Sequence, residues 1–227
     1  MASVTIAGNE TPQALTQVIR CAPPLRRQEA YMSIAVAVRT ADEIVLATDS
    51  KRTFGGGAVP AENLRDNKLR RIGNAYIATT GWGVYSNILD DYIGKNRRVQ
   101  LHDSATIFTF FRNFWKALHQ RYAFVNDQCS ETDSPFGDLD ASFLVAAQSG
   151  IFYVACDMSV TEFDQYYAVG SGAAYALGAM HALYGAKSPA ETVARRAVAA
   201  ASSLDIYCGG DVNLVKLRTR GARSRKK

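Results

Sequence analysis

The chain has 227 residues, of which 48% are hydrophobic and 21% charged; these proportions suit a globular domain with one core and exclude a disordered, collagenous or coiled-coil protein. The formal charge of +5 comes from residues 218–227, which hold six Lys or Arg and no acid, so that the rest of the chain sums to −1. We therefore expect a solvated basic tail, and we do not expect nucleic acid as a partner.

The N-terminal third begins with a segment unlike the rest of the chain. Residues 1–32 show no sustained strand or helix period, and we interpret them as a leader, a propeptide or a mis-assigned extension. Two β-branched runs at 33–39 and 44–49, separated by a short polar break, predict a hairpin. The glycine-rich stretch 53–63 predicts a loop, and 72–80 predicts a third strand.

Two helices are expected next. Residues 84–93 carry apolar side chains at helical spacing, and Ser104 is the expected N-cap of a longer helix over 105–124. The polar stretch 126–140 predicts a loop. One stripe of the longer helix is expected to enter the core: Ile107, Phe108, Phe111, Trp115, Leu118 and Tyr122.

The second half of the chain repeats the order of strands followed by helices. Strands are expected at 141–147, at 151–156 and towards Val169, and Gly-Ser-Gly at 170–172 opens a helix that runs to Tyr184. The last helix and strand are predicted from three features: Ser188 as a cap, Pro189 and Glu191 in the first turn, and an apolar strand at 212–217. Hairpins alternating with paired helices predict an α+β fold, a four-layer α-β-β-α sandwich.

Several chemistries find no support in the sequence. The four cysteines, Cys21, Cys129, Cys156 and Cys208, form no Cys-x-x-Cys pair and have no zinc spacing to the three histidines, so we expect reduced thiols, no metal and no cofactor. No run reaches the roughly 18–20 apolar residues of a membrane helix, and no signal peptide is evident. We expect a cytoplasmic protein without membrane contact.

The stretch from Ser33 to Gly81 holds residues suited to N-terminal-nucleophile catalysis. Ser33 begins a strand, Asp49 ends its hairpin partner, Lys68 follows the loop and Gly81 lies at a strand-to-helix turn. A serine that is residue one of the mature chain can use its own α-amine as base, because that amine titrates near ~7.7–8.0 in model compounds. Ordinary structural roles, such as ion pairs, a helix cap or a tight turn, are the alternatives at these positions.

Six motifs in order extend this interpretation over residues 33–217. The motifs are Ser33-Ile-Ala-Val-Ala-Val, Leu46-Ala-Thr-Asp49-Ser-Lys-Arg-Thr53, Asn67-Lys68-Leu69-Arg70-Arg71, Thr79-Thr80-Gly81, Tyr167-Ala-Val-Gly-Ser171-Gly and Leu204-Asp205-Ile-Tyr-Cys208-Gly-Gly-Asp-Val-Asn. With these motifs the chain resembles the proteasome β-subunit family, and is similar to the bacterial HslV peptidase and to bacterial proteasome homologues.

The resemblance implies the N-terminal nucleophile hydrolase fold and a role for each matched residue. Ser33 would be the nucleophile, Lys68 the cation that lowers the pKa of the amine and hydroxyl, and Asp49 the partner of that lysine. The remaining implied roles are these: the amide of Gly81 as oxyanion donor, Ser171 and Asp205 as hydrogen-bonding groups around the N-terminus, Cys208 in place of the usual serine, Thr53 as a binder of substrate backbone, and Thr79 as a lining residue of the substrate pocket.

The chain departs from the family pattern at the nucleophile. Ser33 replaces threonine and lacks the methyl group that restricts rotation of the hydroxyl. Met32 stands where relatives with propeptides have glycine. We expect Met32 to be the true translation start, with removal of methionine exposing Ser33; the rival interpretation is a propeptide removed by autolysis.

The resemblance implies an endopeptidase that acts on polypeptides inside a homo-oligomeric double ring of six- or sevenfold symmetry. The sequence does not decide whether an ATP-dependent unfoldase is a partner of this ring. Two alternatives remain: a catalytically silent ring subunit that serves as scaffold, and an N-terminal-nucleophile amidase acting on a small molecule. Ser33, Asp49 and Lys68 together favour the peptidase over the silent subunit, and the ring-family motifs favour it over the amidase.

Overall fold

The computed structural model describes residues 32–54, 57–65, 67–122, 139–185 and 188–219. Four sequence predictions therefore lie wholly or largely outside the described residues: the character of residues 1–31, the loop at 126–138, the basic tail from 220 onward, and the thiols Cys21 and Cys129.

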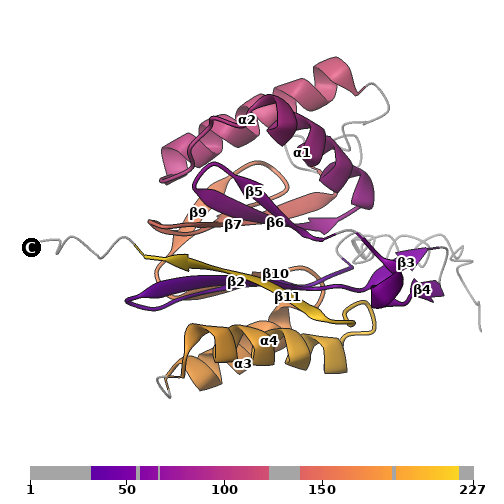
Figure 1. The fold of residues 1–227 in the computed structure, drawn as a ribbon, viewed down its shortest axis with the longest axis vertical. Coiled ribbons are helices and arrows are strands. Elements are labelled where there is room, and N and C mark those ends of the chain that lie inside the picture. The colour runs from indigo at the N-terminus through magenta and orange to yellow at the C-terminus, as the bar shows by residue number, and fades with distance from the viewer. Residues whose placement is uncertain (1–31, 55–56, 66, 123–138, 186–187, 220–227) are drawn as a thin grey trace, which may run out of the picture.

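Two antiparallel sheets lie face to face, and a pair of helices covers the outer face of each (Figure 1). The four-stranded sheet has the order β10 (Tyr166–Val169), β1 (Ala35–Arg39), β2 (Glu43–Asp49), β11 (Val212–Arg218), and α3 (Ala173–Tyr184) and α4 (Ala190–Leu204) cover it. The five-stranded sheet has the order β5 (Leu69–Ile72), β6 (Ala75–Gly81), β7 (Ala141–Ala147), β8 (Gly150–Val154), β9 (Val160–Phe163), and α1 (Gly83–Lys95) and α2 (Ser104–Arg121) cover it. The predicted α-β-β-α sandwich is confirmed.

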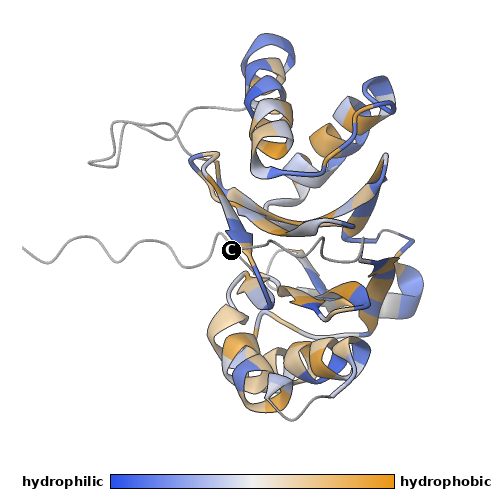
Figure 2. Cartoon of the chain, turned by 90° about the vertical axis from the view of Figure 1, so that its left-hand side faces the viewer, coloured by the Kyte–Doolittle hydropathy of each residue, from blue (hydrophilic) through white to orange (hydrophobic). Residues whose placement is uncertain are grey.

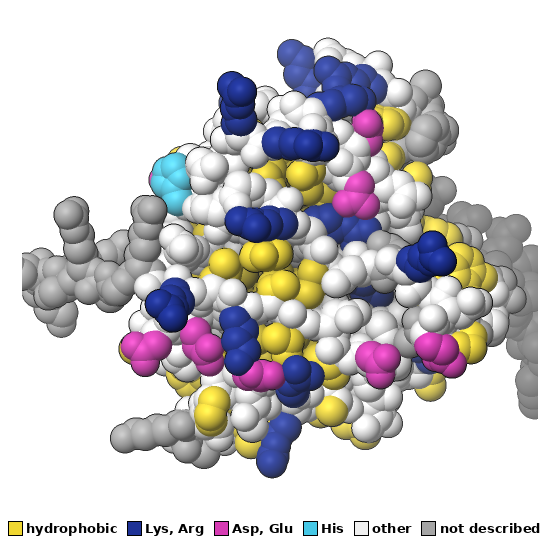
Figure 3. Space-filling model, viewed as in Figure 1, with side chains coloured by type: hydrophobic (Ala, Val, Ile, Leu, Met, Phe, Trp, Pro, Cys, Tyr) yellow, Lys and Arg dark blue, Asp and Glu magenta, His cyan; other side chains and the backbone are white. Residues whose placement is uncertain are grey.

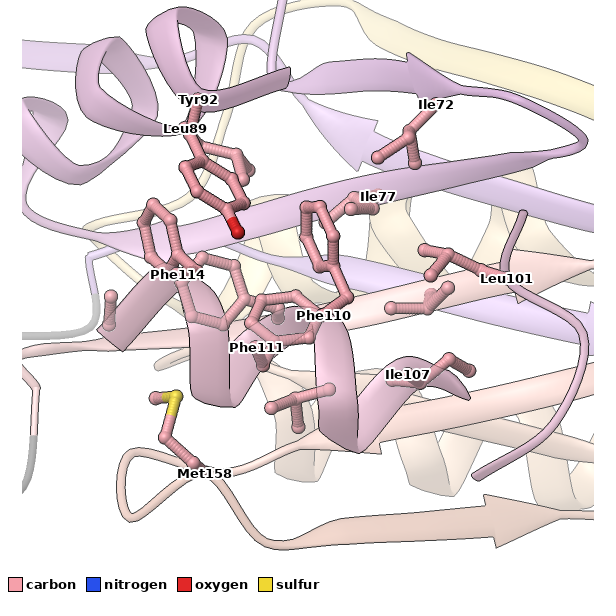
Figure 4. Close-up of a cluster of buried hydrophobic side chains, with 14 of the residues drawn as sticks. Ile72, Ile77, Leu89, Tyr92, Leu101, Ile107, Phe110, Phe111, Phe114 and Met158 are labelled. Carbon is pink, nitrogen blue, oxygen red and sulfur yellow. The ribbon is translucent and has the colours of Figure 1, made fainter. Parts of the chain in front are cut away.

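The core has a separate apolar layer at each of the three interfaces. Under α1 and α2 the layer is rich in aromatic residues: Phe110 and Phe114 pack edge-on against Tyr92, and Phe111 packs against both (Figure 4). Under α3 and α4 it is built from small side chains such as Ala194. Central strands such as β1, β2 and β7 bury both faces, which explains their nearly continuous apolar runs. Figure 2 shows hydrophobic and hydrophilic residues alternating along the helices of both outer layers.

Most predicted elements are confirmed. The first hairpin pairs Ala35 with Thr48, the second pairs Ala147 with Gly150, and helices lie over both predicted pairs of segments. The Gly-Ser-Gly segment does open α3, and the last strand lies at Val212–Arg218 as expected.

Two predictions about strands are wrong. The stretch 72–80 is not one strand, because the chain turns at Gly73, whose φ of +50° suits glycine, and the residues on either side pair as β5 and β6. The predicted loop at 53–63 contains a two-stranded ribbon, β3 (Arg52–Phe54) with β4 (Gly57–Val59), followed by a short 3-10 turn at Ala61–Asn63. The strand β9 was not predicted.

Predictions about helix ends and faces are also corrected. Asp103, not Ser104, caps α2: its carboxylate accepts a hydrogen bond from the amide of Thr106 at 2.8 Å, and the Thr106 hydroxyl accepts one from the amide of Asp103. Ser188 does not cap α4, whose N-cap position is Pro189. The predicted core stripe of α2 is confirmed except at Phe108, which is 45% exposed. Phe110 and Phe114, which were not predicted, are buried in the same cluster.

Candidate active site

Ser33 and Asp49 meet because β1 and β2 pair antiparallel. Ala35 lies opposite Thr48, which brings the start of β1 against the end of β2. The Ser33 hydroxyl donates a hydrogen bond to Oδ1 of Asp49 at 2.8 Å. Both side chains are buried, with 3% and 0% of their surfaces exposed. In this structure Met32 precedes Ser33, so that the nitrogen of Ser33 is a peptide nitrogen.

Lys68 completes a triangle with these two residues. It lies just before β5 on the other sheet, and its ammonium nitrogen is 2.6 Å from the Ser33 hydroxyl oxygen and 2.6 Å from Oδ1 of Asp49. Burial lowers the pKa of the Lys68 ammonium below its usual value, the Asp49 carboxylate opposes that shift, and the charge of Arg52 adds to it. A cation in contact with the hydroxyl favours ionisation of that hydroxyl.

Asp49 is held in place by backbone donors from two other segments. The amide of Ile34 donates to Oδ1 at 3.1 Å, and the amide of Gly209 donates to Oδ2 at 3.2 Å. A carboxylate with several donors and a cation is satisfied although it is fully buried. Sequence reasoning missed Gly209, and its only signal was the Cys-Gly-Gly-Asp motif.

The Gly-Ser-Gly segment packs against the backbone of Ser33. The Ser171 hydroxyl lies 3.4 Å from both the nitrogen and the carbonyl oxygen of Ser33, and the amide of Gly172 is 3.5 Å from the same oxygen. Gly170 has a φ of +109°, and a Cβ there would lie 2.2 Å from that oxygen. Glycine is therefore required at 170, a role that sequence reasoning did not assign.

Gly81 ends β6 close to this segment. The methyl group of Thr80 would lie 3.3 Å from a Cβ on Gly170, which places the end of β6 beside the backbone of Ser33. Gly81 itself has a φ of +112°, and a Cβ there would lie 2.1 Å from the carbonyl oxygen of Asp140. The turn before α1 therefore needs glycine for conformational reasons, whether or not its amide has a chemical role.

Cys208 and Asp205 lie on the loop after α4. The thiol of Cys208 is 3.9 Å from the Ser171 hydroxyl and is buried, and burial with the negative charges of Asp49 and Asp205 raises its pKa to about 12. The carboxylate of Asp205 accepts a hydrogen bond from the amide of Tyr207 at 2.8 Å. Among the described residues the Asp205 carboxylate has no hydrogen bond to Ser33, and its charge acts on the Cys208 thiol; its role around a free N-terminus stays a prediction.

The two residues expected to bind substrate lie on different strands. The Thr53 hydroxyl, on β3, faces the sulfur of Met32 at 3.8 Å. Thr79, on β6, is 5% exposed, and its hydroxyl has no hydrogen-bond partner among the described residues.

The described part of the chain offers no metal site and no membrane-spanning helix. No cluster of His, Cys, Asp and Glu there could hold a metal ion, and no helix there is long and apolar enough to cross a membrane.

On the face shown in Figure 3, Lys and Arg are more numerous over the upper helices, and both signs of charge occur lower down.

Comparison with known proteins finds similar solved structures. No protein-family profile matches the chain. A solved structure of BPH, a bacterial proteasome homologue from Thiobacillus denitrificans, is similar to it with 34% identity and a TM-score of 0.75, covering 82% of this chain and 97% of that one. The complex of that BPH with epoxomicin has 34% identity and a TM-score of 0.74, covering 82% and 98%. Eukaryotic HslV from Trypanosoma brucei shares the fold, with 21% identity and a TM-score of 0.56. The match covers 82% of this chain and 99% of that one.

Proposed function

The chain belongs to the proteasome β-subunit family, and on that premise we propose that it is an endopeptidase subunit with Ser33 as its N-terminal nucleophile. The observation that carries the proposal is the buried triangle of Ser33, Asp49 and Lys68, with sides of 2.6–2.8 Å. A buried lysine in contact with a hydroxyl is the arrangement that activates an oxygen nucleophile without histidine.

The proposed reaction begins once residues 1–32 are absent and Ser33 carries a free α-amine. The amine takes the proton of the hydroxyl while Oγ attacks the scissile carbonyl carbon, and Lys68 stabilises the negative charge on the oxygen during that transfer. The C–N bond then breaks, the proton passes to the leaving amine, and an ester remains on Ser33. Water attacks the ester, with the α-amine again as base, and releases the carboxylic acid and the hydroxyl of Ser33.

The tetrahedral intermediate needs a donor for its oxyanion. We assign this role to the amide of Gly81, since the end of β6 lies beside Ser33 through Thr80 and Gly170. Loss of such a donor commonly costs about 3–4 kcal/mol of transition-state stabilisation. Ser171 would fix the freed amine, because its hydroxyl already lies 3.4 Å from the nitrogen of Ser33.

Substrate backbone is proposed to lie along Thr53. The residue that precedes the nucleophile, Met32, already contacts the Thr53 hydroxyl, so that removal of Met32 would uncover this position. The unpartnered hydroxyl of Thr79 supports a place for Thr79 in the wall of the pocket, where it would be available to a polar group of substrate.

The proposed working form is a homo-oligomeric double ring in the cytoplasm. Large apolar side chains are exposed at the end of β3 and in two connecting segments, namely Phe54, Trp82 and Ile206 at 62%, 55% and 76%. Burial against other copies would remove them from water. The free thiols of Cys156 and Cys208 suit a reducing compartment. Mass photometry would measure the ring, and stimulation of protein hydrolysis by an added ATPase would test an unfoldase partner.

The decisive experiment is the intact mass of protein that begins at Ser33, before and after incubation with epoxomicin. An epoxyketone that closes a ring on both hydroxyl and α-amine is expected to add one inhibitor per chain. Ser33→Ala should abolish the addition, whereas Ser203→Ala, which changes an exposed hydroxyl on α4, should not.

The same measurement separates the alternatives. A chain that begins at Ser33, forms rings and gains no mass would contradict the peptidase and favour a silent subunit. Addition of the inhibitor without cleavage of any polypeptide, together with hydrolysis of small amides, would favour an amidase.

A further inference from the structure

Arg70 is a buried cation close to the triangle that the proposed mechanism does not use. It lies on β5, two residues after Lys68, and it is 7% exposed. Lys68 reaches Ser33 and Asp49 of the facing sheet, whereas Arg70 reaches α1 on the outer face. Its guanidinium binds the Asp90 carboxylate of α1 with both ends: Nε is 2.9 Å from Oδ1 and Nη2 is 3.1 Å from Oδ2. The remaining nitrogen, Nη1, donates to the carbonyl oxygen of Asn67.

These contacts fix the backbone on both sides of Lys68. On one side Arg70 holds the Asn67 carbonyl; on the other, the side chain of Asn67 accepts a hydrogen bond from the amide of Leu69 at 2.9 Å. Lys68 stands between the two held groups. A lysine side chain has four rotatable bonds and loses up to about 2 kcal/mol of rotamer entropy when ordered, so that its reach depends on where its Cα is held.

A link made only for stability would not need this chemistry. The Asp90 side chain is 51% exposed, and an ion pair with a solvent-exposed partner contributes only about 0–1 kcal/mol. The planar fork of arginine, in contrast, sets both distance and direction between the elements that it joins. Here those elements are α1, which follows the Gly81 turn, and the start of β5, which Lys68 directly precedes.

We propose that Arg70, clamped by Asp90, is a positioning residue that sets the place of the Lys68 ammonium against Ser33 and Asp49. The inference rests on the proposed function, because it concerns the placing of that function's catalytic cation. It assigns Arg70 and Asp90 no contact with substrate.

The test uses a pair of neighbouring substitutions on α1. Asp90→Asn removes the carboxylate that holds Arg70, and Asp91→Asn removes an exposed carboxylate that pairs only with Lys95 and Tyr122 among the described residues. Misplacement of a catalytic group by about 1 Å can cost about 100-fold in rate. We expect Asp90→Asn to lower the rate constant of covalent modification by epoxomicin about 10- to 100-fold with an unchanged inhibitor binding constant, and Asp91→Asn to change neither.

The conservative variant distinguishes geometry from charge. Arg70→Lys keeps the positive charge but cannot make the forked contact and also reach Asn67, so it should be as slow as Arg70→Met. Full activity in Arg70→Lys, or equal rates in Asp90→Asn and Asp91→Asn, would overturn the inference.

A second measurement does not depend on catalysis. Lys68 is faced by Asp49 from β2, by Arg52 from β3 and by Cys208 from the loop after α4. If the contact between Arg70 and Asp90 is lost, the Lys68 ammonium gains access to water. The pKa of Lys68 should then rise towards its usual value in Asp90→Asn but not in Asp91→Asn. This pKa can be followed by ¹⁵N NMR, with the Lys68 signal assigned by its loss in Lys68→Arg. An unmodified parent protein would refute the proposed function; an unchanged titration in Asp90→Asn would refute the clamp.

Discussion

The buried pair of Asp49 and Lys68 makes a prediction about stability that requires no substrate. Asp49 is fully buried, Lys68 is 6% exposed, and 2.6 Å separates their charged atoms. Removing one partner of a buried pair costs about 3–5 kcal/mol, because the other charge stays buried without compensation. Asp49→Asn should reach that range, and Lys68→Met should fall at its lower end, since the amides of Ile34 and Gly209 still bind the carboxylate.

The double variant Asp49→Asn, Lys68→Met removes both charges together. It should therefore lose much less than the sum of the two single losses, with a coupling energy of about 3 kcal/mol or more. Thermal unfolding at one protein concentration, with the oligomeric state checked for each variant, gives the comparison. At about 2–4 °C per kcal/mol for a chain of this size, each single variant should melt about 6–20 °C lower than the parent.

The pH dependence of this loss has a definite sign. In Asp49→Asn the burial that lowers the pKa of Lys68 is no longer opposed by a carboxylate. The folded state then binds fewer protons than the unfolded state between that lowered pKa and the unfolded value of about 10.4, so stability rises with pH in that window. The deficit of Asp49→Asn should shrink as the pH increases. Additive losses, or deficits below about 1 kcal/mol in both single variants, would refute the buried-pair reasoning.

Three further predictions concern the same region. Gly170→Ala should lose at least about 2 kcal/mol of unfolding free energy, because residue 170 has a positive φ and its Cβ would lie 2.2 Å from the Ser33 carbonyl oxygen. Gly178→Ala, in open space within α3, should gain about 0.5–1 kcal/mol. Equal shifts of the melting temperature in the two variants would contradict the steric argument. Cys208, with its pKa raised to about 12 by burial, should escape iodoacetamide at pH 8 in the native protein, and a carbamidomethyl mass on its peptide would contradict the burial. The rate of epoxomicin addition should decline at alkaline pH with a midpoint below 10.5, because the lowered pKa of Lys68 removes the ammonium charge there, and a plateau beyond pH 10.5 would count against its role.

The order of elements was predictable because local patterns determine it. Apolar β-branched runs, helical spacing and glycine turns are properties of short segments, and they predicted the alternation of hairpins and helix pairs that builds the sandwich. The candidates Ser33, Asp49, Lys68 and Ser171 came from motifs in a fixed order, and the structure brings these four side chains together. Their catalytic roles stay predictions, which epoxomicin addition and the variants of these residues test.

Only the tertiary structure decided which side chains meet across elements. The Arg70–Asp90 contact joins a strand to a helix 20 residues later, and neither residue has a local pattern that names its partner. Phe108 is 45% exposed while Phe110 enters the core, because the packing of Phe111 against Phe143 of β7 sets the rotation of α2. Local sequence determines the period and the ends of an element; its rotation and its partners follow from the simultaneous burial of all the layers, which a single segment does not encode.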